Sequence, residues 1–105
     1  MHWISIENLD DNDKIARGAA FKLLPTKEGA LIGNYIPKCG LIYILVDLPG
    51  EDHMCLTCLS EGEEGNTMSL LKKQGTYVLG KEVKRMLLDK IQIVLINKMP
   101  KYEIK

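Results

Sequence analysis

The chain is poor in aromatic residues, in cysteine and in net charge. Of its 105 residues, 6% are aromatic and three are cysteine, and 14 acidic side chains balance 14 Lys and Arg. An odd number of cysteines argues against a disulfide framework, and zero net charge gives no general attraction to nucleic acid or anionic lipid. The apolar content of 46% and the charged content of 27% are those of a globular domain, so wholesale disorder is excluded.

The sequence also lacks long hydrophobic runs and targeting signals. Its longest apolar run is Leu41–Val46, whereas a membrane-spanning helix needs about 20 residues. The first residues contain neither the basic region nor the apolar stretch of a secretory signal. We therefore expect one cytoplasmic domain over residues 1–105 without membrane contact. A chain of this length buries roughly two-thirds of its unfolded surface, which suffices for a core without metals or disulfides.

The apolar run is the feature around which the other elements are expected to pack. Leu41–Val46 contains only apolar or aromatic side chains, and Gly40 and Pro49-Gly50 flank it as turn residues do. A run this short that is apolar throughout is typical of a strand buried on both faces. Such a strand needs neighbours along both of its edges.

Short connections place two predicted strands beside it. Residues 30–36 form one, joined to the central run by four residues, and His53–Leu59 forms the other after the turn at residues 49–52. Loops of this length usually join antiparallel partners. Residues 30–60 are therefore predicted to be a three-stranded antiparallel meander with residues 41–48 in its middle.

A first helix is predicted between Asp10 and Pro25. Asp10 can cap it, and Asp11 and Asp13 would lie in its first turn, where the helix dipole favours negative charge. The apolar residues between Ile15 and Leu24 recur with helical spacing, and the residue before a proline is pushed away from helical angles.

Two further helices and three further strands complete the expected elements. A short helix covers Met68–Lys73, and an amphipathic helix follows Gly80. The strands are expected at residues 3–6, at residues 76–79 as an edge strand, and at residues 91–96 as an internal closing strand. Residues 60–67 are polar and glycine-rich and are predicted to be an exposed flexible loop, and residues 97–105 a basic tail.

This pattern of elements predicts an α+β fold. We expect about five strands in a small mixed or mostly antiparallel sheet, with two or three short helices on one face. The alternative is a small β-barrel with helical caps.

The thiols and one histidine are the candidate metal ligands. Cys39, His53, Cys55 and Cys58 could supply a Cys₃His zinc site, and any of the three thiols with His2 or His53 is a candidate pair for thiol chemistry. However, a strand over residues 53–59 would direct Cys55 and Cys58 to opposite faces, because side chains alternate along a strand. Buried packing of the thiols is therefore favoured, and we predict no cofactor.

The charges are unevenly distributed along the chain. Residues 47–64 contain six acids and no Lys or Arg, whereas bases prevail from Lys81 to the end. This asymmetry indicates either a solvated surface or a self-complementary interface between copies. Bases with few interleaved aromatics are a weak signal for nucleic-acid binding. The candidate residues are Lys81, Lys84, Arg85, Lys98 and Lys101.

No catalytic motif and no family resemblance appear in the sequence. We therefore expect a non-catalytic cytosolic binding or regulatory module that acts through a protein partner, through self-association as a homo-oligomer, or through a small ligand. Several nearly all-apolar strands with few aromatics to cover them leave apolar surface for a partner. The alternatives are a thiol- or metal-dependent small enzyme and a weak nucleic-acid binder.

Overall fold

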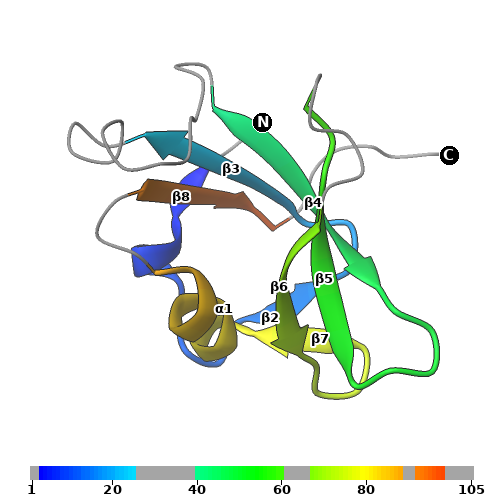
Figure 1. Ribbon diagram of the computed structural model, residues 1–105. Coiled ribbons are helices and arrows are strands. Elements are labelled where there is room, and N and C mark those ends of the chain that lie inside the picture. Colours follow the sequence, from blue (N-terminus) through cyan, green and yellow to red (C-terminus); the bar gives the residue numbers. More distant parts are fainter. Residues whose placement is uncertain (1–2, 26–39, 61–66, 89–91, 99–105) are drawn as a thin grey trace, which may run out of the picture.

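A computed structural model of the chain describes residues 3–25, 40–60, 67–88 and 92–98 (Figure 1). The described elements are mostly strands. They are β1 (Ile4–Ser5), the 3₁₀ helix η1 (Ile6–Asn8), β2 (Lys14–Ala16), β3 (Ala20–Pro25), β4 (Leu41–Asp47), β5 (His53–Cys58), β6 (Thr67–Lys72), β7 (Tyr77–Leu79), the helix α1 (Gly80–Leu87) and β8 (Gln92–Asn97). Their radius of gyration of 13.4 Å is that of a compact domain, for which about 13 Å is usual at 100 residues.

Six of the strands form one curled antiparallel sheet in the order β1-β8-β3-β4-β5-β6. The prediction of a central strand at residues 41–46 is confirmed, because β4 pairs with β3 on one edge and β5 on the other. The prediction that residues 91–96 form an internal strand is also confirmed, since β8 lies between β1 and β3. The predicted strand at residues 30–36 lies outside the described residues. Within the described part, β3 occupies the edge of β4 expected for it.

The core fills the concave side of this sheet. Alternate residues of the strands point into it, and Phe21, Leu45, Met54, Leu56 and Ile96 are fully buried there. The small β2–β7 sheet and α1 cover this core from the open side. As Figure 1 shows, α1 lies between β6 and η1, so the helix fills the opening between the two ends of the sheet.

The helix predicted for residues 10–24 is wrong, because this segment forms β2 and β3. Near β3 its residues in the core cluster, Ala19, Phe21 and Leu23, alternate, which is the period of a strand. Gly18 has a φ of 91°, a left-handed conformation that ends β2 and turns the chain into β3. An α-helix cannot continue through such a residue.

The short helix predicted for residues 68–73 is also wrong. The segment is β6, which pairs antiparallel with β5. The predicted edge strand at residues 76–79 is present as β7, paired with β2 in a sheet of its own. The fold is therefore mostly sheet, with one α-helix in the described part of the chain. It agrees in part with the barrel alternative and not with an α+β fold of two or three helices.

The amphipathic helix predicted after Gly80 is confirmed as α1. Its first two amides donate to backbone carbonyls of the acidic turn: Gly80 to Asp13 at 2.8 Å and Lys81 to Asp11 at 3.0 Å. The turn lies so close that a Cβ on Gly80 would overlap the carbonyl of Asp10. The acidic residues 10–13 thus lie at the N-terminus of a helix, as predicted. That helix is α1, and not one that the acidic residues themselves begin. No helix in the described ranges is both long and apolar enough to cross a bilayer.

Candidate functional site

The convex side of the sheet, here called the outer face, is largely apolar. Strand residues directly opposite each other share a face, and the register pairs Val46 with Cys55 and Cys55 with Leu70. Leu70 and Ile93 are the most exposed of its side chains, at 55% and 43%. The apolar residues of the outer face are Ala20, Leu24, Ile42, Ile44, Val46, Cys55, Leu70, Ile93 and Leu95.

One part of the outer face is covered by the N-terminal segment. Lys22, which lies opposite Ile42 and Leu95, places its ammonium 4.8 Å from the ring centroid of Trp3. A cation over an indole face at this distance is attracted to the ring. Trp3 therefore ties the start of the described chain to the sheet, while Leu70 and Ile93, away from this pair, stay exposed.

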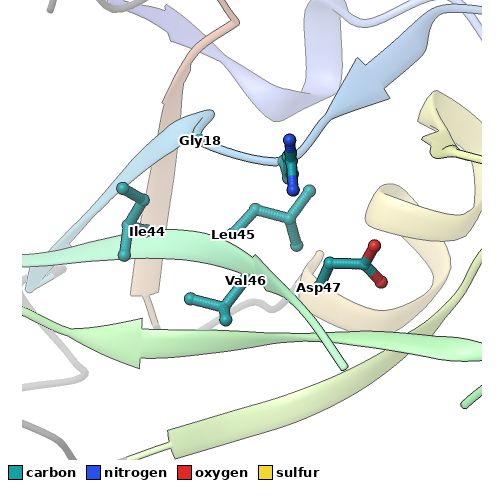
Figure 2. Close-up of a pocket in the computed structure, with 6 residues that line it drawn as sticks. Gly18, Ile44, Leu45, Val46 and Asp47 are labelled. Atoms are coloured by element: carbon teal, nitrogen blue, oxygen red, sulfur yellow. The ribbon is translucent and has the colours of Figure 1, made fainter. Parts of the chain in front are cut away.

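A shallow depression of about 400 Å³ lies where β4 runs past the turn between β2 and β3. It is lined by Arg17, Gly18 and the β4 residues from Ile44 to Asp47. Gly18 donates to the Leu45 carbonyl at 2.8 Å, and Leu45 donates to the Ala19 carbonyl at 2.9 Å. Figure 2 shows Gly18 facing the strand that carries Ile44, Leu45, Val46 and Asp47. On the N-terminal side of Gly18 the chain belongs to β2, which pairs with β7 and not with β4. The depression lies at this point.

The acidic side chain of the depression, Asp47, forms an ion pair. Lys73 Nζ lies 2.6 Å from Asp47 Oδ1. This hydrogen bond, followed by the charges of Lys73 and Arg17 and a backbone hydrogen bond from Leu48, lowers the pKa of Asp47 below its ordinary value of 3.8. A carboxylate held in its charged form is a weak proton acceptor near neutral pH. Among the described residues, the lining contains no histidine, cysteine or hydroxyl side chain.

The structure does not bring the candidate metal ligands together. Cys58 is buried in the core, whereas Cys55 lies on the outer face with its Sγ 3.9 Å from Thr57 Oγ1. His53 is half-buried at the start of β5, opposite Lys72. Cys39 lies outside the described residues. Among the residues that the structure describes, no three Cys, His, Asp or Glu side chains are grouped to hold a metal.

The candidate nucleic-acid-binding residues are paired largely with acids of the same chain. Lys84 Nζ lies 2.6 Å from Asp11 Oδ1 and also donates to the Leu9 carbonyl at 2.8 Å. The hydrogen bond from Lys84 to Asp11, together with the charge of Lys84, lowers the pKa of Asp11. The other ion pairs of this set join Arg85 to Glu82 and Lys98 to Asp13. Lys81 is exposed at the start of α1, and Lys101 lies outside the described residues.

Arg17 of the depression and Lys73, the ion-pair partner of Asp47, were not among the candidates from sequence. Arg17 was assigned to a helix interior, and Lys73 to the end of a second helix. Neither has a local sequence signal, because the turn at Gly18 and the pairing of β5 with β6 place them near Asp47. The proximity of positions 17, 47 and 73 depends on contacts between distant segments.

No known protein family, curated protein or solved structure shows a significant match to this chain. The functional conclusion therefore depends on the surface and the depression described above.

Proposed function

We propose that the protein is a non-catalytic cytosolic binding or regulatory module that contacts another polypeptide through the outer face of its sheet. The observation that supports this most is the apolar character of that face, where Leu70 and Ile93 are exposed while the concave side is already filled by the core. Exposed apolar clusters on a domain mark interaction surfaces.

The paired charges favour binding over catalysis. The negative charge of Asp47 is balanced by the positive charge of Lys73, and the thiols of Cys55 and Cys58 are buried and free. Free buried thiols are usual in a reducing compartment and act there as small apolar side chains. A small ligand at the depression is a second form of the binding function. The nucleic-acid alternative receives less support, because three of its candidate bases form ion pairs within the chain.

A site-specific photo-crosslinker tests the proposal in the native host cell. Placed at Ile93, which is 43% exposed on the outer face, it should yield a discrete adduct with another polypeptide. Leu88 is the matched control, because it is 51% exposed but follows α1 rather than lying on the sheet. Equal adducts at both positions, or none at Ile93, would contradict an interaction through the outer face.

A further inference from the structure

The strand β6 is an open edge of the six-stranded sheet. It pairs with β5 on one side, and no described strand pairs with its other side. The opposite edge strand, β1, has two residues, so β6 is the longer edge in the described part of the molecule. An exposed edge presents unpaired backbone groups that can accept another strand.

The free backbone groups of this edge can be located from one hydrogen bond. The amide of Lys72 donates to Glu82 Oε2 on α1 at 2.8 Å, so it points away from β5. Alternate residues of an antiparallel strand direct their backbone groups to the same side. The N–H and C=O of Leu70 therefore also point away from β5, into the open edge.

Leu70 is also the most exposed large apolar side chain among the described residues, at 55%. It ends the row Val46–Cys55–Leu70, which crosses three strands of the outer face. Glu82 occupies the edge at Lys72, and a register shift opposite Cys55/Leu56 interrupts the pairing with β5. The accessible part of the edge is thus short and centred on Leu70.

The charge of Lys72 selects the orientation of an incoming strand. Lys72 ends β6 and is exposed. Two copies of β6 in parallel would place the two Lys72 side chains together, whereas antiparallel copies centred on Leu70 place them at opposite ends of the pair. A two-fold interface of this kind is self-complementary.

We propose that two copies of the protein pair through antiparallel β6 strands, with Leu70 opposite the partner's Leu70. In this register the two residues exchange both backbone hydrogen bonds, and the apolar row of each outer face continues into the other. The proposal narrows the proposed binding function to one partner, a second copy of this chain.

Sedimentation equilibrium tests the dimer. The unaltered protein should be dimeric at high micromolar concentration, and Leu70→Lys should weaken association at least tenfold. Leu59→Lys is the matched control, because Leu59 is 51% exposed but follows β5 rather than lying on the β6 edge, and it should remain dimeric. A monomeric unaltered protein, or a dimer insensitive to Leu70→Lys, would overturn the proposal.

A proline pair tests the direction of the backbone groups. Leu70→Pro removes an amide that points away from β5, so the variant should stay folded by circular dichroism and become monomeric. Leu71→Pro removes an amide directed at β5 and should lose folded structure. Failure of the dimer together with an outer-face adduct at Ile93 would refute self-pairing and leave the binding function standing. Failure of both would refute the binding function as well.

Discussion

Among the described residues, two aspartates have a shifted pKa. Asp11 and Asp47 each accept a hydrogen bond from one lysine, Lys84 and Lys73 respectively, and the pKa of both carboxyls is lowered. A lowered pKa in the folded state means that the unfolded state binds protons more readily. The stabilisation is therefore present above the ordinary value of 3.8 and is lost as the pH falls through the folded pKa.

Asp47→Asn tests this linkage. The difference in free energy of unfolding between the unaltered protein and this variant should be largest near pH 7 and should shrink as the pH falls below about 5. Urea denaturation at a series of pH values measures it. Salt should reduce the difference at pH 7, because the pair lies partly in solvent. A difference that grows toward acid pH would contradict the assignment of Asp47 as the charged partner of Lys73.

Among the elements, α1 depends on an unusually close contact. The acidic turn at residues 10–13 supplies carbonyls to its first two amides, and Asp11 and Asp13 place negative charge near its N-terminus. Negative charge there is favourable, because the peptide dipoles of a helix leave positive potential at that end. Lys84 and Lys98 join the same two aspartates, so the turn connects α1 and the end of β8 to the N-terminal part of the chain.

Gly80→Ala should separate α1 from this turn. The added methyl group would overlap the Asp10 carbonyl, so the variant should lose about 3 kcal/mol of stability. Gly75→Ala is the control, because Gly75 has open space around it and a φ of 68°, and only left-handed strain of about 1 kcal/mol is expected. Urea midpoints of the two variants provide the comparison. Equal losses of stability in the two variants would show that the turn at residues 10–13 moves to make room for the added methyl group.

The elements that could be predicted from sequence are those whose signal is local. β4 is a continuous apolar run between turn residues, and α1 has a helical apolar stripe after Gly80. The segment from Ile15 to Leu24 satisfies both periods, and its pairing with β4 and β8 decides in favour of strands. Such pairing involves residues far apart in the sequence, as between Ala20 and Asn97, which no local pattern contains.

At the scale of the whole molecule, the two faces of the sheet differ in what they contribute. The concave face contains the core, whereas the outer face exposes apolar side chains. The nearly all-apolar strands in the sequence predict that some apolar surface stays uncovered by the rest of the chain. The location of that surface, and the depression at Arg17 and Asp47, could not be predicted, because both depend on which strands are neighbours.

The two faces should respond differently to substitution. Phe21→Ala removes a fully buried ring and should cost about 3–5 kcal/mol of stability. Ile93→Thr keeps a β-branched side chain at an exposed position of β8 and should change stability by about 0.5 kcal/mol or less. Thermal unfolding of both variants measures this. A large loss from Ile93→Thr would mean that the outer face is part of the folding core.

The position of β8 has a consequence for how the protein is made. β8 is translated after every other described strand, yet it lies between β1 and β3, which are among the first. While the ribosome is still synthesising residues 92–97, the edges of β1 and β3 that pair with β8 have no partner strand, and the apolar side chains beside them face water. Sheets that wait for such distant pairing fold slowly. The nascent chain should therefore become resistant to protease only after β8 has emerged from the exit tunnel.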